Sequence, residues 1–217
     1  MAPEPHELLP ASTRARMQYG DDARARDFAR FMREHSGQAH IVALQDYPDP
    51  DAISSALAYR AIAAAHDIDA DIVYEGRISH QENLALVHLL DIELTRFTGA
   101  LPLDRYDGAV FLDNQGTTTR LTDRLGEAGV PALAIIDHHA PQGLLTPEFS
   151  DIRPVGATAT IMTDYLRSGE VLVLDPESVE HTRLATALVH GLRSETNHFI
   201  GAGPEEFAAA SFLAPFM

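Results

Sequence analysis

Cysteine is absent from this sequence of 217 residues, and so is lysine. Without cysteine the chain can form no disulfide bond, thiolate nucleophile or cysteine-ligated zinc site. The lack of lysine means that all 16 basic side chains are arginines, which we attribute to genomic composition rather than to mechanism. No run of about 18 apolar residues, the length that spans a bilayer, is present, and residues 1–10 lack the apolar segment of a signal peptide. We therefore expect a cytoplasmic protein with no membrane partner.

Positive charge is scarce in general, because 32 acidic residues outnumber the 16 arginines and leave a formal net charge of −16. Long nucleic acid is bound mainly through basic side chains, so the charge argues against it as a partner. A short nucleotide stays compatible with this charge if metal ions supply the positive charge locally. The sequence also lacks the His-Glu-x-x-His and Gly-x-Ser-x-Gly motifs, which removes the usual support for a zinc protease or a serine hydrolase.

Short apolar runs alternate with helical segments, a pattern that predicts an α/β fold with an open, mainly parallel sheet and helices on both faces. Residues 1–38 are expected to form an N-terminal arm and one helix, and residues 39–217 the main domain. The interpretation of 171–174 stays open between a strand and part of a helical pair, and 191–199 is predicted to be a polar loop. Strands are expected at 41–44, 70–74, 94–97, 108–112 and 132–136, and helices at 21–35, 52–65, 81–90, 119–128, 158–166, 177–189 and 204–213.

Acidic and imidazole side chains follow three of the predicted strands. Asp49 and Asp51 come after the first, Asp113 directly follows the fourth, and Asp137-His138-His139 follows the fifth. Ligands of an open parallel sheet bind beyond the carboxyl ends of its strands, where these residues should meet. Hard oxygen donors with one or two imidazoles suit Mn²⁺ or Mg²⁺. Several carboxylates could hold two ions roughly 3.5–4 Å apart, as in displacement at phosphorus.

A second interpretation of the first segment needs no metal. Proline and aspartate favour turns and helix N-caps, so that residues 45–51 could be a surface turn leading into a helix. The segment alone does not decide between the two interpretations, and the other two strand ends favour the metal or phosphate site.

Three motifs in this order resemble those of the DHH phosphoesterase family. They are Pro48-Asp49-Pro50-Asp51 before a helix of small residues, Asp113 after a strand, and Asp137-His138-His139 after another strand. The family includes RecJ-type exonucleases, nano-RNases and adenosine-bisphosphate phosphatases, and family II pyrophosphatases are its relatives. The resemblance covers about residues 39–200.

The resemblance implies a role for each matching residue. Asp49 and Asp51 would each ligate one metal ion, Asp113 would bridge both ions, and His138 would ligate the second. His139 would lie toward the scissile phosphate, so that Asp113, His138 and His139 form the catalytic set. Asp137 would orient the histidines from behind.

Two positions depart from the family pattern. Gln45 stands where the family often has a metal-ligating histidine, and Glu195 stands where the fourth motif usually has an aspartate. We predict that both are metal ligands. Because both differ from the usual residue, the alternative is a nucleotide- or metal-binding regulatory module that no longer catalyses hydrolysis. Thr158 and Arg193 are further candidates for contact with a substrate phosphate. Each also has an ordinary structural explanation, since Thr158 could simply begin a packed helix and Arg193 could form a structural ion pair.

The leading hypothesis is a phosphoesterase that uses Mn²⁺ or Mg²⁺, with two ions, to hydrolyse a phosphate ester of a small nucleotide or very short oligonucleotide. A pyrophosphatase or polyphosphatase is a third hypothesis. The glycine-rich stretch that marks a C-terminal substrate domain in many family members is missing, so that this domain is expected to be absent. The sequence leaves open a homodimer.

Overall fold

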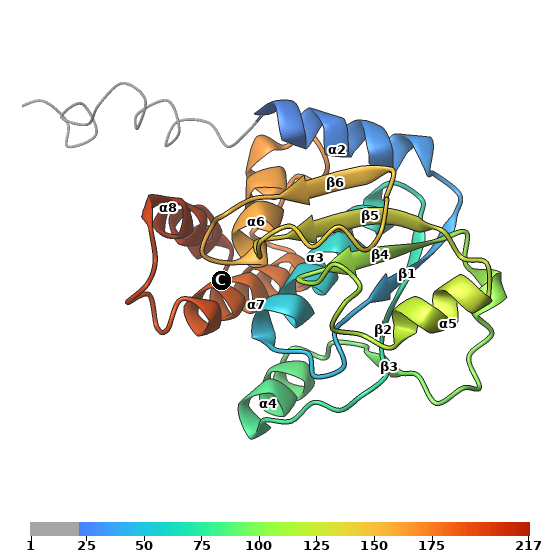
Figure 1. Ribbon diagram of the computed structural model, residues 1–217. Coiled ribbons are helices and arrows are strands. Elements are labelled where there is room, and N and C mark those ends of the chain that lie inside the picture. Colours follow the sequence, from blue (N-terminus) through green and yellow to red (C-terminus); the bar gives the residue numbers. More distant parts are fainter. Residues whose placement is uncertain (1–21) are drawn as a thin grey trace, which may run out of the picture.

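A single sheet of six strands forms the centre of the protein, which is described for residues 22–217 by a computed structural model (Figure 1). The strand order is β3-β2-β1-β4-β5-β6, and every neighbouring pair is parallel. This arrangement confirms the predicted α/β fold with an open parallel sheet. The strands are β1 (Ala39–Ala43), β2 (Asp69–Tyr74), β3 (Thr95–Arg96), β4 (Gly108–Leu112), β5 (Ala132–Asp137) and β6 (Phe149–Ile152).

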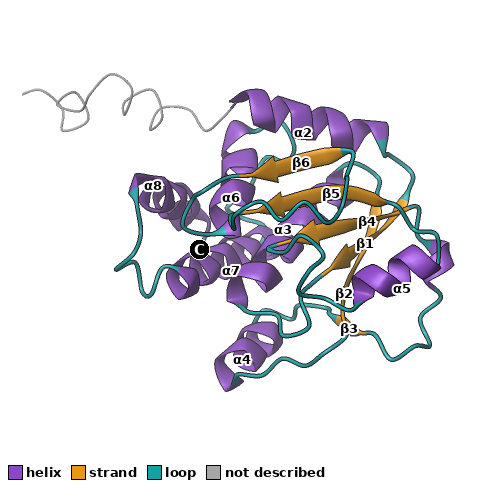
Figure 2. Ribbon diagram, in the orientation of Figure 1, coloured by secondary structure: helices purple, strands orange, loops and turns teal. Residues whose placement is uncertain are grey.

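Helices cover both faces of the sheet, but unequally (Figure 2). One face packs against most of the helices, whereas α5 and the short 3₁₀ helix at Leu103–Arg105 supply the apolar cover of the other. The α-helices are α2 (Asp22–Glu34), α3 (Pro50–Ala65), α4 (Gln81–Leu89), α5 (Leu121–Glu127), α6 (Thr158–Ser168), α7 (Val179–Glu195) and α8 (Pro204–Leu213), and a 3₁₀ turn follows at Ala214–Phe216.

The central strands are almost entirely apolar, apart from His40 in β1 and Asp137 at the end of β5, because both of their faces are buried. In β1, Val42 points into the larger core with α3 and α7, while Ile41 and Ala43 point into the smaller core with α5. All three side chains are fully buried. The alternation of side chains along a strand therefore divides one apolar run between two helix layers.

The point where the strand order reverses lies between β1 and β4, because β2 continues on one side of β1 and β4 on the other. Ligands of open α/β sheets bind at this point, beyond the carboxyl ends of the strands. The side chain of Asn114 joins the two strands there, since its Nδ2 donates to the carbonyls of Ala43 (3.1 Å) and Leu112 (3.0 Å).

Three local predictions were wrong, and one lies outside the described residues. The strand β6 was not predicted, because a short edge strand containing Ser150 and Asp151 lacks an apolar run. Residues 171–174 form neither a strand nor a helix, and α7 continues to Glu195 through the start of the predicted loop at 191–199. The expected arm at residues 1–20 falls on residues that the structure does not describe.

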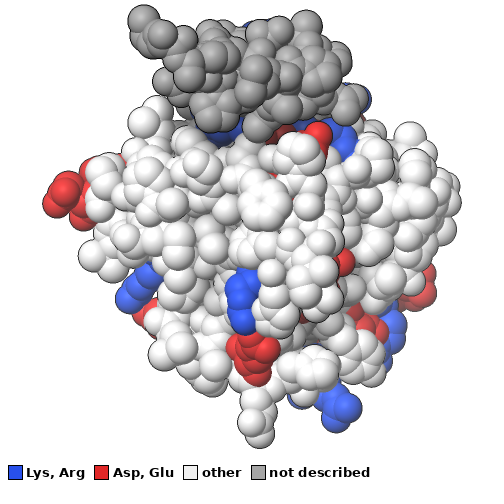
Figure 3. Space-filling view, turned by 90° about the vertical axis from the view of Figure 1, so that its left-hand side faces the viewer, with Lys and Arg blue, Asp and Glu red and all other residues white. Residues whose placement is uncertain are grey.

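Figure 3 looks onto the left-hand side of Figure 1, toward which the strands of the sheet point. Arginine side chains on this face are separated from one another by uncharged and acidic surface. Within residues 22–217, none of the helices is long and apolar enough to cross a membrane.

Candidate metal centre

Asp49 begins the site and also caps a helix. It is the N-cap of α3, where its Oδ1 accepts from the amide of Ala52 at 3.0 Å, and Pro50 occupies the first helical position. Its Oδ2 accepts from Nε2 of Gln45 at 3.1 Å. The turn-and-cap interpretation of this segment therefore describes Asp49 correctly, and Gln45 lies beside it.

Asp51 has a different environment from Asp49, although it is only two residues away. Its side chain is completely buried, and its two oxygens accept from the amides of Thr158 and Ala159, each at 2.7 Å. These amides belong to the first turn of α6, where backbone N–H groups lack helical partners. Burial and the nearby carboxylate of Asp49 nevertheless raise the pKa of Asp51 to about 8. A simple surface turn would not bury this carboxylate.

Asp113 lies directly beyond the end of β4, in a left-handed backbone conformation with a φ of 58°. Aspartate adopts this conformation more readily than most residues. Its Oδ1 accepts from the hydroxyl of Thr158 at 3.0 Å. Burial raises its pKa well above the ordinary value, and the carboxylates of Asp51 and Asp49 raise it further. Three acidic groups therefore repel one another at this end of the sheet.

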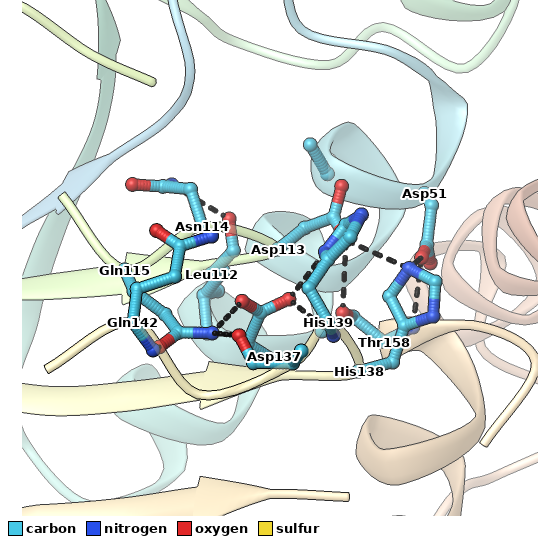
Figure 4. Close-up of polar contacts among 12 residues, drawn as sticks. Asp51, Leu112, Asp113, Asn114, Gln115, Asp137, His138, His139, Gln142 and Thr158 are labelled. Atoms are coloured by element: carbon cyan, nitrogen blue, oxygen red, sulfur yellow. Dashed lines mark hydrogen bonds and ion pairs between the residues drawn. The ribbon is translucent and has the colours of Figure 1, made fainter. Parts of the chain in front are cut away.

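His138 points one nitrogen at the carboxylates of Asp51 and Asp113 (Figure 4). Together with Glu195, these carboxylates are called the acidic cluster. Its Nδ1 lies 3.2 Å from the carbonyl of Val155, which can only accept, so Nδ1 is assigned a proton and, in the neutral ring, Nε2 offers the lone pair. This Nε2 is buried and has no hydrogen-bond partner. It lies 3.4 Å from Asp113 Oδ1, 3.7 Å from Glu195 Oε1 and 3.9 Å from Asp51 Oδ2.

A cation accounts for this arrangement. Three carboxylate oxygens and one imidazole nitrogen surround one space, where burial and mutual repulsion raise the pKa of Asp51 and of Asp113. Such a group of atoms needs a proton or a cation among them. Carboxylate oxygens with one imidazole are the donors that Mn²⁺ and Mg²⁺ accept. Asp113, His138 and His139 each also offer one ligand atom within 4.8 Å of the others. The residues present therefore fit a divalent metal ion.

His139 is oriented by Asp137 rather than by the acidic cluster. Oδ1 of Asp137 accepts from Nδ1 of His139 at 2.8 Å and from its amide at 3.2 Å, and the side chain of His139 is half exposed. Oδ2 of Asp137 accepts from Nε2 of Gln115 at 2.7 Å. Asp137 therefore orients His139 but makes no hydrogen bond to His138, whereas we predicted that it would orient both histidines. His138 depends instead on Val155.

Glu195 reaches the site from the last turn of α7, and the prediction that it lies in a polar loop was wrong. The helix continues because Gly191 packs directly on the first turn of α3. A Cβ at position 191 would lie 2.3 Å from Ser54 Oγ, so only glycine allows this approach. Glu195 follows one helical turn later on the same face and ends 3.7 Å from His138.

The two predicted substrate contacts lie in different surroundings. Thr158 has its amide and hydroxyl bonded to Asp51 and Asp113, so it holds two acidic residues together. Arg193 lies on α7 with Nη1 3.6 Å from Glu82 Oε1. A substrate contact remains a prediction for both residues.

Sequence reasoning missed Gln115, the carbonyl of Val155 and the amide of Ala159. Gln115 Oε1 also accepts from the amide of Gln142 at 2.8 Å, which joins the loop after His139 to the loop after β4. Its place two residues after Asp113 was the available signal. Backbone groups leave no signal in the sequence, because every residue carries them.

Comparison with known proteins gives consistent matches. The model of a family described as "DHH family, N-terminal domain" matches residues 40–192. An uncharacterized protein of Methanocaldococcus jannaschii is 38% identical over 172 residues, which are 78% of this chain and 33% of that protein. A probable manganese-dependent inorganic pyrophosphatase of Bacillus cereus is 30% identical over 128 residues, 58% of this chain and 40% of its own length.

A solved structure has a similar fold. The crystal structure of an exopolyphosphatase-related protein from Bacteroides fragilis superposes with a TM-score of 0.69 at 18% identity, covering 89% of this chain and 56% of that one. The chain thus spans between a third and about half of the length of these proteins.

Proposed function

Because the chain belongs to the DHH family, we propose that it is a divalent-metal-dependent phosphoesterase. The observation that carries this proposal is Nε2 of His138, which is buried without a hydrogen-bond partner and lies among the carboxylates of Asp51, Asp113 and Glu195. Manganese is the proposed metal, because the donor set suits it and the similar pyrophosphatase is named as manganese-dependent.

The ligands would come from both sides of the reversal point of the sheet. Asp113 and His138 would hold one ion together with Asp51 and Glu195, and Asp49 with Gln45 would contribute to a second. Divalent ions held there would activate a water molecule and offset the charge of the phosphate. The expected number of two ions rests on the number of acidic groups.

The chain's own residues would orient the ligands and move a proton. Thr158 holds Asp51 and Asp113 in place by donating its amide to the first and its hydroxyl to the second. His139 donates Nδ1–H to Asp137, which leaves Nε2 of its half-exposed ring available to the substrate. In the doubly protonated ring, Nε2–H would give its proton to the leaving-group oxygen. Such a carboxylate–histidine pair suits general acid catalysis.

The proposed substrate is a small phosphorylated nucleotide or a very short oligonucleotide. A compact phosphate fits a chain of net charge −16 whose attraction for anions would come from metal ions. The test measures Mn²⁺-dependent hydrolysis of a dinucleotide and of adenosine bisphosphate. Asp113→Asn should lower the rate at least about 100-fold, whereas Asp123→Asn on the exposed side of α5 should leave it unchanged.

Full activity of the Asp113→Asn protein would overturn the proposed mechanism. Tight nucleotide binding without turnover in Mn²⁺, Mg²⁺ and Co²⁺ would instead support the regulatory module. That alternative rests on Gln45 and Glu195, which stand where the family often has a histidine and usually has an aspartate.

A second candidate function is hydrolysis of pyrophosphate. The similarity to a probable manganese-dependent inorganic pyrophosphatase favours it. The same assay with pyrophosphate decides between the two, because a higher kcat/KM for pyrophosphate than for both nucleotides would select the pyrophosphatase.

A further inference from the structure

Glu206 is a buried carboxylate outside the acidic cluster and outside the residues matched by the family model. It lies in the first turn of α8 and is only 2% exposed. Its Oε2 accepts from the amide of Gly203 at 2.7 Å, which caps the helix. A cap needs no burial, since capping glutamates are commonly exposed at the surface. The burial of Glu206 therefore requires a further explanation.

The other oxygen of Glu206 binds the segment that precedes α6. Oε1 accepts from the amide of Gly156 at 2.8 Å and from the hydroxyl of Thr160 at 3.1 Å. No arginine or histidine among the described residues forms an ion pair with it. Both oxygens of the carboxylate are thus satisfied by neutral donors, namely Gly156 before α6, Thr160 in α6 and Gly203 at the N-cap of α8. These bonds fix α6, α8 and the segment before α6 relative to one another.

The segment held by Glu206 also holds the candidate metal ligands. The carbonyl of Val155 accepts from His138 and sets which of its nitrogens carries the lone pair. The amides of Thr158 and Ala159 bind both oxygens of Asp51. Gly156, which Glu206 contacts, lies between these groups in the chain. A shift of this segment would move His138 and Asp51 together.

The packing beside Gly156 leaves little freedom for such a shift. A Cβ at position 156 would lie 2.7 Å from Cδ of Glu206 and 3.0 Å from its Oε2. The carboxylate therefore fills the space directly behind the segment, and the absence of a side chain at Gly156 lets it approach. The contact is steric as well as polar.

We propose that Glu206 is a positioning residue of the metal centre, which acts through residues 155–159 on His138 and Asp51. This inference rests on the proposed function, because it concerns the same site. In this inference α8 stabilises the position of the metal ligands through the hydrogen bonds of Glu206 to Gly156 and Thr160. Groups that orient metal ligands typically change metal affinity about 10- to 100-fold when they are removed.

The first test is hydrogen–deuterium exchange on the metal-free protein. Glu206→Ala should speed the exchange of the amides of residues 156–159 at least about tenfold, because their brace is lost. Glu205→Ala is the matched control, since it removes the same charge from the same helical turn. Equal protection of residues 156–159 in both variants would overturn the inference whatever the metal affinity.

The second test is Mn²⁺ affinity by isothermal titration calorimetry. Glu206→Ala should raise the Kd about tenfold relative to Glu205→Ala. Gly156→Ala, whose new Cβ would collide with the carboxylate of Glu206, should also raise the Kd for Mn²⁺. It replaces Glu206→Ala in this test if that variant does not fold. Wild-type affinity in Gly156→Ala and in Glu206→Ala would contradict the role. A wild-type chain that binds no Mn²⁺ would refute the proposed function, while the exchange result would still decide whether Glu206 braces the segment.

Discussion

The amide of Thr158 donates to Oδ2 of Asp51 over 2.7 Å, although 107 residues separate the two in the chain. The first turn of α6 thereby meets the first turn of α3 beyond the ends of the central strands. The same threonine donates its hydroxyl to Asp113. One residue thus joins two acidic groups that repel each other.

Stability should depend on pH in opposite ways with and without Mn²⁺. The pKa of Asp51 lies at about 8 in the folded chain, against an ordinary value of 3.8. Between about pH 7 and pH 8.5 the metal-free folded state therefore binds more protons than the unfolded state, and its free energy of unfolding should fall by about 1 kcal/mol as the pH rises. The melting temperature in EDTA should drop by about 2–4 °C.

Mn²⁺ should reverse this trend, because metal ions bind the ionised carboxylates and compete with protons. The stabilisation by Mn²⁺ should therefore grow over the same pH interval. Thermal unfolding with EDTA and with Mn²⁺ measures both effects. A metal-free protein whose melting temperature rises between these pH values would contradict the assignment.

Gly191→Ala should weaken both the fold and the metal site. The new Cβ would lie 2.3 Å from Ser54 Oγ and would push α7 away from α3. Overpacking of this kind costs about 1–3 kcal/mol. Because Glu195 lies one turn further along α7, Mn²⁺ affinity should fall as well. Chemical denaturation and calorimetry measure the two effects.

Gly126→Ala is the matched control for this substitution. Gly126 lies within α5, and nothing lies within 4 Å of a Cβ placed there. Alanine should stabilise that helix by about 0.5–1 kcal/mol and leave Mn²⁺ affinity unchanged. Unaltered metal binding in Gly191→Ala would show that the close approach of α3 and α7 does not position Glu195.

His40 should make the protein sensitive to mild acid. It is buried between Tyr59 and Gln38, whose contacts with its two nitrogens (2.7 and 3.2 Å) suit the neutral ring. Burial, aided by His35, lowers its pKa from 6.5 to about 4. Below about pH 6.5 the unfolded state therefore takes up the proton first, and stability should fall by about 1–2 kcal/mol between about pH 7 and pH 5.

His40→Gln tests the source of this acid sensitivity. Glutamine keeps an acceptor for the hydroxyl of Tyr59 and cannot titrate. The variant should lose less stability over that pH interval than the wild type in urea denaturation. An unchanged dependence on pH would assign the effect to other groups.

Gln45→His should raise Mn²⁺ affinity about tenfold, because imidazole is a better ligand than an amide for a transition metal. Gln45 already lies beside Asp49, with 3.1 Å between Nε2 and Oδ2. Calorimetry measures the affinity, and the hydrolysis assay shows whether turnover increases with it. Lower affinity in the variant would exclude position 45 from the ligands.

The strands and most helices follow from local chemistry. Each central strand contains an apolar run. The helix α8 matches its prediction at both ends, because Pro204 starts it and apolar residues continue to Leu213. The end of α7 was missed because Gly191 and the polar residues after it resemble a loop locally. Packing against Ser54, far away in the chain, keeps that segment helical.

The fold class, and the acidic and imidazole residues at the ends of three strands, could be predicted from the sequence alone, since apolar periodicity and motif spacing are local properties. The tertiary structure decided how these residues are held. It separated Asp49, a helix cap, from the fully buried Asp51. It also aimed Nε2 of His138 at three carboxylates by means of the carbonyl of Val155. Backbone groups and distant helices make these choices, because a hydrogen bond depends on position in space rather than on order along the chain.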